Sequence, residues 1–408
     1  MTPRTVVIIG GGAAGMMSGI FAAYNGDNAI ILEKNQKVGR KLYITGKGRC
    51  NVTNNCTVET VIANTPTNPR FLYSALNRFS PQDTIDFFEM NGIPLKTERG
   101  NRVFPVSDKA SDIVDALFRI CKQAGCKIIN EAATDIIIEN NIVTAVKTSS
   151  RTIKCDKIII ACGGKSYPLT GSTGDGYKFA QKAGHHITPL KPSLVPLESS
   201  DKFCFELNGL QLKNISINVI ENKTGKKIYN DFGELLFTHY GMSGPVILSA
   251  SSHMRDMSPD KYKITIDLKP ALSEEQLDAR LIRELAKNHA KEYTDILRSL
   301  LPAKMIDAFA RLSEIPTHKK CGEITKIERH NIIKLLKNFE VSIKSFRPIE
   351  EAIVTSGGVD TKEINPKTMQ SKLVSGLYFA GEVIDIDCYT GGFNLQAAFS
   401  TGVLAGEN

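Results

Sequence analysis

The chain opens with glycines spaced as in a dinucleotide-binding turn. An uncharged, β-branched run at residues 6–9 predicts a buried strand, and the small apolar residues 13–24 predict a helix packed on it. Between them, Gly10 permits the tight turn, Gly12 lets the backbone approach a pyrophosphate, and Gly15 lets helix and strand pack closely. A glycine-rich turn in some other α/β protein is the alternative, but the neighbouring elements favour a nucleotide.

The acid after the next apolar run, residues 29–32, indicates the kind of nucleotide. Glu33 lies roughly 20 residues beyond the glycines, where a carboxylate accepts hydrogen bonds from a ribose 2′-hydroxyl and repels a 2′-phosphate. The phosphates would lie on the N–H groups at Ala13 and Ala14, at the positive end of the helix, with Lys34 close by. We therefore expect FAD or NAD rather than NADP.

A basic, glycine-rich segment at residues 38–54 follows. Its glycines leave backbone N–H groups free to face a ligand, while Arg40 and Lys41 offset the charge of a pyrophosphate. A solvated surface loop is the alternative. The position of the segment, directly after a dinucleotide half-site, favours a part in the site.

Two later strands also run into glycines. Residues 157–160 lead to Gly163, and a strand near the C-terminus leads to Gly381 and Glu382. A closing helix then begins near Gly392. Because these segments lie far from the first turn in the sequence, they make one site only if they meet it in space. Their meeting would form one extended FAD site.

The middle of the chain predicts two insertions. Short alternating runs in residues 191–270 predict a small β-barrel, and residues 271–344, which open with a capping box at Ser273, predict a helical subdomain. Residues 1–190 and 345–408 remain for the FAD domain. The helical insertion is rich in lysine, so RNA binding stays open as an alternative to a solvated face.

Composition narrows the class of protein. The chain has 408 residues, 42% of them hydrophobic and 23% charged, which is typical of a soluble protein with two or three domains. No apolar run approaches membrane-spanning length, and the N-terminus has no signal-peptide pattern. Nine cysteines without a C-x-x-C pair predict reduced thiols in a bacterial-type cytoplasm and no metal site. The net charge of +8 is spread widely, so nucleic acid is not the expected partner.

Five motifs in order resemble a known family. They are G-G-G-A-A-G at residues 10–15, G-R-K-x-x-x-T-G-x-G-R-C-N-x-T-N at 39–54, A-C-G-G-x-S-Y-P at 161–168, T-H-Y-G-M-S-G-P at 238–245, and A-G-E-V-I-D with T-G-G-F-N-L-Q-A-A within 380–398. Together they resemble the aminoacetone-oxidase-like family of FAD-binding flavoproteins, which includes reductases of 3-dehydro bile acids. The resemblance covers essentially the whole chain and is not specific for a substrate.

The resemblance implies an α/β fold, a glutathione-reductase-type Rossmann FAD domain with an inserted β-barrel and an inserted helical subdomain. It also implies cofactor contacts from both ends of the chain, with Ala133 beside the adenine, Asp385 toward the ribityl chain, and Phe393 and Asn394 at the flavin ring. The other implied contacts are Gly12, Ala13, Ala14, Glu33, Arg40, Lys41, Asn51, Gly163, Gly381 and Gly392. The chain departs from the family at Cys388, where glycine is common, so the backbone path beside the flavin stays open.

The redox chemistry of FAD needs a proton donor beside it. His239 and Tyr240 are the candidates, because imidazole titrates near neutrality and a phenol can donate a proton to an enolate. A turn histidine bonded only to backbone is an equal alternative. No second G-x-G-x-x-G motif is present, so we expect NADH or NADPH to visit the flavin transiently as electron donor.

Three functions follow for the chain. The favoured one is a reductase that takes electrons from NAD(P)H and reduces the conjugated C=C of an enone or dienone, such as a steroid or bile acid. The second is an amine oxidase that passes electrons from a small amine to oxygen. The third is a flavoprotein that binds or acts on RNA. The sequence indicates a small-molecule substrate and no membrane, and leaves the oligomeric state open.

Overall fold

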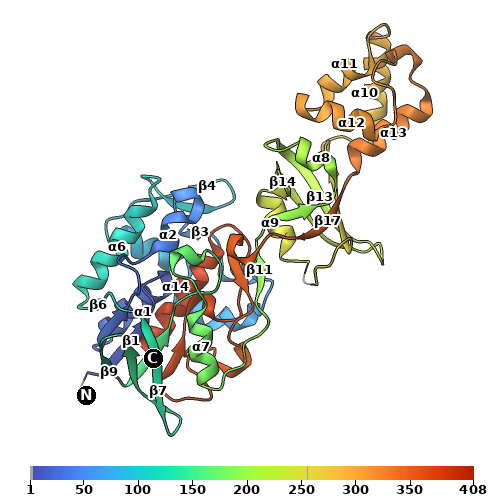
Figure 1. Ribbon diagram of the computed structural model, residues 1–408. Helices are drawn as coiled ribbons and strands as arrows, with labels where there is room; N and C mark the ends of the chain where they lie inside the picture. The colour runs from blue at the N-terminus through green and yellow to red at the C-terminus, as the bar shows by residue number, and fades with distance from the viewer. Residues whose placement is uncertain (1–2, 255) are drawn as a thin grey trace. The chain divides into compact units, whose positions relative to one another are not determined.

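The computed structural model describes residues 3–254 and 256–408, which form two compact units (Figure 1). Unit 1 comprises the described residues up to Ser193 together with Pro348–Asn408, and unit 2 is Leu194–Arg347. Each unit has its own apolar core. Both ends of the chain therefore build one unit, and the middle of the chain builds the other.

Unit 1 is organised around a five-stranded sheet in the order β19-β10-β1-β2-β6, and every neighbouring pair is parallel. Residues such as Ile8 and Ile159 are fully buried, as expected for strands covered on both faces. This is the doubly wound arrangement in which ligands bind at the carboxyl ends of the strands. The strands are β1 Thr5–Ile9, β2 Asn28–Leu32, β6 Lys127–Ile129, β10 Lys157–Ile160 and β19 Leu377–Phe379.

Two helices from opposite ends of the chain pack against each other in unit 1. They are α1 Ala13–Tyr24 and α14 Phe393–Glu407 (Figure 1). A Cβ atom at Gly402 would come within 2.6 Å of the Ala14 carbonyl oxygen, so the helix backbones meet closely there. At the far end of α14, the fully buried Lys157 donates from Nζ to the carbonyl oxygens of Ala405 and Gly406, at 2.5 and 3.2 Å.

The remaining elements of unit 1 surround this layer. Antiparallel hairpins lie around residues 97–105 and 135–146. Within the basic segment at residues 38–54 the structure has a short helix, and a further helix begins at Asp175. These elements are α2 Arg40–Ile44, β4 Leu95–Glu98, β5 Arg102–Pro105, α6 Ala110–Gln123, β7 Ala133–Glu139, β8 Ile142–Thr148 and α7 Asp175–Lys182.

A short antiparallel ribbon stands where the chain leaves unit 1 and returns to it. Strand β11, Lys191–Ser193, pairs with β18, Val354–Ser356, with Ser193 opposite Val354. The two connections to the inserted unit therefore start from neighbouring strands.

Unit 2 contains a closed barrel in the order β12-β15-β14-β13-β16-β17. Its strands are β12 Leu197–Ser199, β13 Gln211–Glu221, β14 Lys227–Thr238, β15 Gly241–Ser243, β16 Tyr262–Asp267 and β17 Phe339–Phe346. The last strand follows the helices in sequence and lies largely within residues 271–344, which the sequence predicts as helical. Phe339, Val341 and Ile343 alternate into the barrel core, and pairing with β16 overrides the weak local signal.

Four helices complete unit 2 between β16 and β17, and their apolar faces join the barrel core. The first begins at the predicted capping box, where Ser273 and Gln276 satisfy each other's backbone N–H groups. None of the described helices has both the length and the apolar character to cross a membrane. The helices are α10 Glu274–Lys287, α11 Tyr293–Leu300, α12 Ile306–Leu312 and α13 Lys326–Lys337.

Candidate dinucleotide site

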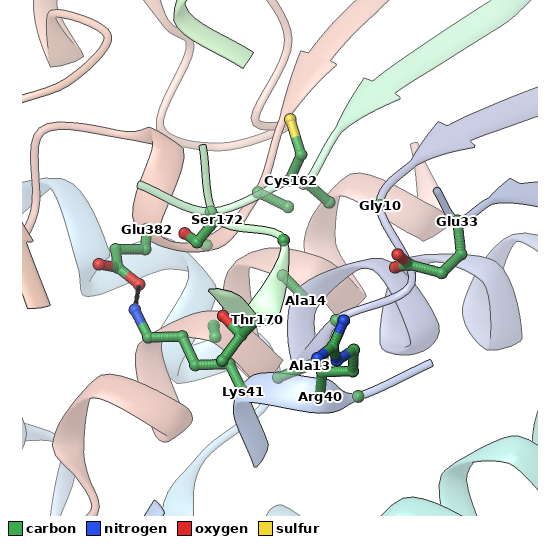
Figure 2. A pocket seen from close by; sticks show the side chains of 18 of the residues that line it. Gly10, Ala13, Ala14, Glu33, Arg40, Lys41, Cys162, Thr170, Ser172 and Glu382 are labelled. Carbon is green, nitrogen blue, oxygen red and sulfur yellow. Dashed lines mark hydrogen bonds and ion pairs between the residues drawn. The ribbon is translucent and has the colours of Figure 1, made fainter. Parts of the chain in front are cut away.

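A long pocket lies over the carboxyl ends of the sheet strands in unit 1 (Figure 2). It holds about 1400 Å³ of space, open solvent at its mouth included. Every lining residue belongs to unit 1.

The glycine turn forms one wall, and each of its three glycines has a distinct environment. Gly10 has φ +107°, a conformation that favours glycine, and a Cβ atom there would lie 2.8 Å from the Ala161 carbonyl oxygen. A Cβ atom at Gly15 would lie 1.9 Å from the Gly10 carbonyl oxygen. At Gly12, by contrast, a Cβ atom would meet nothing within 4 Å, and this residue faces the pocket. Gly12 thus leaves room for a ligand, whereas the other two glycines allow backbone packing.

Helix α1 presents its N-terminus to the same wall. Ala13 and Ala14 line the pocket, and no side chain caps the helix. The first N–H groups of a helix lack partners within the helix, and the macrodipole makes this end positive. The arrangement fits the pyrophosphate of a dinucleotide.

Glu33 lies buried at the end of β2 and also lines the pocket (Figure 2). One carboxylate oxygen accepts from the Gly11 N–H at 2.9 Å, and the other accepts from the backbone N–H and the side-chain amide of Asn35, at 2.8 and 2.7 Å. These donors hold the carboxylate in place, and the oxygen bonded to Gly11 keeps an acceptor site free for a hydroxyl. The environment fits a ribose 2′-hydroxyl.

The cations differ in how free they are to meet a ligand. Lys41 donates from Nζ to Glu382 and Ser166, both at 2.6 Å, so its charge is largely engaged by the protein (Figure 2). Lys34 pairs with Asp175 at 2.7 Å. Arg40 is exposed, and Nη1 donates to Asn35 at 2.9 Å, which leaves its other donors available.

A thiol from the end of β10 also faces the pocket. Burial raises the pKa of Cys162 to about 12. The thiol therefore stays protonated near neutral pH and is a packing group there rather than a thiolate nucleophile.

Most of the cofactor residues expected from the sequence are brought together here. Thirteen of them line the pocket, although their individual roles stay predictions: Gly10, Gly12, Ala13, Ala14, Glu33, Lys34, Arg40, Lys41, Ala133, Gly163, Gly381, Glu382 and Asn394.

Five further expected residues lie outside the lining. Gly15 serves helix packing, and Gly392, with φ +99°, lets the start of α14 approach the Thr53 carbonyl oxygen, to which a Cβ atom would come within 2.3 Å. Phe393 is buried at the start of α14. The Asp385 carboxylate accepts from Asn68 at 3.2 Å, and burial raises its pKa.

The fifth, Asn51, has a buried side-chain oxygen with no hydrogen-bond partner among the described residues. Such an orphaned buried acceptor is costly unless a ligand or water satisfies it. It therefore fits a position beside a cofactor, although it does not line the pocket.

His239 and Tyr240 belong to unit 2 and are not part of the pocket lining. They form the turn between β14 and β15, with ring centroids 4.8 Å apart. The Arg347 guanidinium lies 4.6 Å over the Tyr240 ring and pairs with Glu198 at 2.8 Å. Their part in proton transfer stays a prediction.

Some lining residues were not predicted. Thr170 and Ser172 come from a loop whose glycines and hydroxyls are visible in the sequence, and Ser172 is anchored to the Gly164 carbonyl oxygen at 2.9 Å. Ile353 and Val354, near β18, also line the pocket, and nothing in their local sequence signals this position.

Comparison with known proteins decides the family. The family model described as HI0933-like protein Rossmann domain matches residues 4–408. The chain belongs to the HI0933-like family. It has the Rossmann FAD fold expected from the sequence and is an FAD-dependent oxidoreductase.

Three relatives of this family member align over nearly their whole length. The chain is 29% identical to the 3-dehydro-bile acid delta(4,6)-reductase of Clostridium scindens, over 98% of this chain and 97% of the relative. It is 33% identical to the ribosomal RNA dihydrouridine synthase of Haemophilus influenzae, over 97% and 96%. The synthase of the same name from Escherichia coli is 31% identical, over 97% and 95%.

Solved structures share the fold of this HI0933-like protein. The 3-ketosteroid delta1-dehydrogenase of Sterolibacterium denitrificans has a TM-score of 0.53 at 12% identity, covering 99% of both chains. The 3-ketosteroid-delta4-(5alpha)-dehydrogenase of Rhodococcus jostii has a TM-score of 0.51 at 12% identity, covering 100% of this chain and 99% of that one. At such low identity the likeness concerns the fold.

Proposed function

We propose that the protein is a reductase of a C=C bond conjugated to a carbonyl group, with NADH or NADPH as the electron donor. The observation that carries this proposal is the full-length similarity to relatives whose names describe such a reduction. A delta(4,6) double bond in a 3-dehydro steroid and the C5=C6 bond of uracil are both conjugated to a carbonyl. Bound FAD would supply hydride to the far carbon of that bond.

Uridine in ribosomal RNA is the first candidate substrate. Two relatives named for it are 33% and 31% identical to this chain, and the relative named for a bile acid is 29% identical. The sequence-based expectation that nucleic acid is not a partner rests only on the wide spread of the net charge. The similarity to these two relatives is stronger evidence than that spread. The second candidate is a steroid dienone, supported by the bile-acid relative over 98% of the chain.

The chain's own residues support the reaction at the start of α14, and the proton donor stays our prediction from the sequence. Helix α14 begins at the pocket, where Asn394 clamps the preceding loop through the Cys388 N–H and carbonyl groups, at 2.9 and 2.7 Å. Its positive end would stabilise negative charge on a bound cofactor. His239 or Tyr240 would deliver the proton that completes reduction of the substrate.

The test begins with the purified FAD-loaded protein under anaerobic conditions. Mixing with NADH or NADPH should bleach the flavin absorbance at a rate at least equal to the steady-state turnover rate. Adding rRNA from a strain that lacks this gene should restore the absorbance and form dihydrouridine, measured by mass spectrometry of digested RNA. A 4,6-dien-3-one steroid is the parallel substrate.

Each outcome separates the hypotheses. If the steroid but not the rRNA reoxidises the reduced flavin, the substrate is a steroid dienone and not uridine. No bleaching by either nicotinamide, together with fast reoxidation by oxygen after chemical reduction, would overturn the reductase and favour the amine oxidase.

A further inference from the structure

Helices α10 and α13 lie side by side in unit 2 (Figure 1). Both helices carry exposed basic residues. The helices pack antiparallel, and Asp278 of α10 pairs with Arg329 of α13 at 2.5 Å. Leu281 on α10 and Ile332 on α13 point into the core. The opposite faces of both helices are therefore open to solvent.

Two rows of basic residues occupy these open faces. Arg283 and Lys287 follow each other on α10, and Lys326, His330 and Lys334 follow each other on α13, all at steps of four residues. Residues four apart lie on one side of a helix. All five are exposed, and none has an ion-pair partner among residues 3–254 and 256–408.

The row on α13 lies beside helix α10. The charges of Lys326 and His330 act on Asp278 together with Arg329 and help to lower the pKa of that carboxyl group. The row on α13 therefore borders the Asp278 side of α10, whereas Arg283 lies about 140° around α10 from Asp278, on its outward face.

The acids of these helices do not neutralise the face. Glu328 is engaged by Lys319 at 2.6 Å, on the other side of α13. Glu284 lies one turn beyond Arg280, whose guanidinium bonds the Ser299 carbonyl oxygen, so this side of α10 turns toward α11. Glu274 and Glu275 are exposed on the first turn of α10, away from Arg283 and Lys287 but level with the last turn of α13, where Lys337 donates to the Leu272 carbonyl oxygen. These two acids do not balance the basic residues of both helices. The surplus charge on the face is positive.

We propose that this face, defined by Arg283, Lys287, Lys326, His330 and Lys334, docks the phosphate backbone of RNA. The inference rests on the proposed function with uridine in rRNA as substrate, because a uridine must be delivered within a polyanion. Unpaired lysine and arginine side chains are the groups that contact phosphates and make binding salt-dependent.

A membrane surface fits these helices less well. The exposed large aliphatic residues on α10 and α13 are Ile282 and Ile327, 47% and 74% exposed. Two isoleucines do not form the continuous apolar stripe by which an amphipathic helix enters a bilayer. Beside phosphate contacts, isolated aliphatic side chains can lie against sugars.

The test reverses the charge of three members of the face in the full-length, FAD-loaded protein, as Arg283→Glu, Lys326→Glu and Lys334→Glu. The matched control is Lys154→Glu, Lys223→Glu and Lys367→Glu, which changes the net charge equally at exposed lysines that have no ion pair in the described chain. The probes are a fluorescein-labelled 20-nucleotide oligouridylate and rRNA extracted from a strain that lacks this gene.

The face variant should bind both RNAs at least roughly tenfold more weakly than wild type at low salt. Its slope of log affinity against log salt should fall by about two, since each phosphate contact contributes about 0.7 on a single strand. The control should stay within about twofold. Flavin bleaching by NAD(P)H should be the same in all three proteins, because the face takes no part in the pocket.

Equal loss of affinity in both variants, or none in either, would overturn the docking face while leaving the reductase intact. Binding of wild type to phosphatidylglycerol vesicles but not to RNA would also overturn it. If wild type binds RNA through this face but reduces only the steroid, the proposed substrate fails and the docking face stands.

Discussion

At the scale of single residues, the carboxylate of Glu33 is held by several hydrogen bonds at the pocket wall. Its three N–H donors come from the glycine turn and from Asn35, so the position of each oxygen is determined before any ligand arrives. Such preorganisation lowers the cost of binding. The residue is therefore a sensitive test of how the nucleotide is held.

Replacing this carboxylate by an amide, Glu33→Gln, should weaken FAD binding. A hydrogen bond to a charged group contributes roughly 1.5–3 kcal/mol, so the dissociation constant should rise about ten- to hundredfold. Titration of the apoprotein with FAD, followed by flavin fluorescence, measures the change. The exposed Glu89 of helix α5, Pro81–Met90, provides the control as Glu89→Gln. An unchanged dissociation constant in Glu33→Gln would mean that the ribose lies elsewhere.

At the scale of elements, the strand–turn–helix unit predicts opposite behaviour for two of its glycines. Gly15→Ala places a methyl group against the Gly10 carbonyl oxygen, so the apoprotein should lose at least roughly 1–3 kcal/mol of stability. Gly12→Ala meets no protein atom, so the apoprotein should keep its melting temperature but lose FAD. Calorimetry of both apoproteins and the flavin absorbance of both as purified provide the measurements. Equal melting temperatures would show that α1 can shift away from β1.

The sequence predicts those parts of the site whose residues follow one another along the chain. The glycine turn and Glu33 follow one another along a strand, a helix and a strand, so their spacing carries the information. Val354 reaches the pocket only through the topology of the fold, and no local pattern marks it. Likewise β17 forms because β16 pairs with it, and its place in the barrel is visible only in three dimensions.

At the scale of the whole molecule, one buried amine makes stability depend on pH. Burial lowers the pKa of Lys157 to about 7, against 10.5 for an exposed lysine. Between these values the unfolded chain holds a proton that the folded chain lacks, so stability rises with pH. Burial raises the pKa of thiols such as Cys50 to about 12, which opposes the rise above about pH 9.

The window for Lys157 is therefore about pH 7 to 9, with a slope of at most about 1.4 kcal/mol per pH unit. The neutral amine can still donate to the last carbonyl groups of α14. We expect the difference in melting temperature between wild type and Lys157→Met to grow in favour of wild type across this window. Lys154→Met, at an exposed lysine, serves as control. A difference that stays constant with pH would show that the amine keeps its proton when buried.

The ribbon of β11 and β18 has a consequence for how this architecture could diversify. Both connections to unit 2 leave from adjacent strands, while the pocket draws on unit 1 alone. Residues 194–347 therefore form an inserted unit whose sequence can change without altering the pocket in unit 1. We therefore expect insertions and substitutions within this one contiguous stretch of the gene to leave the cofactor pocket intact.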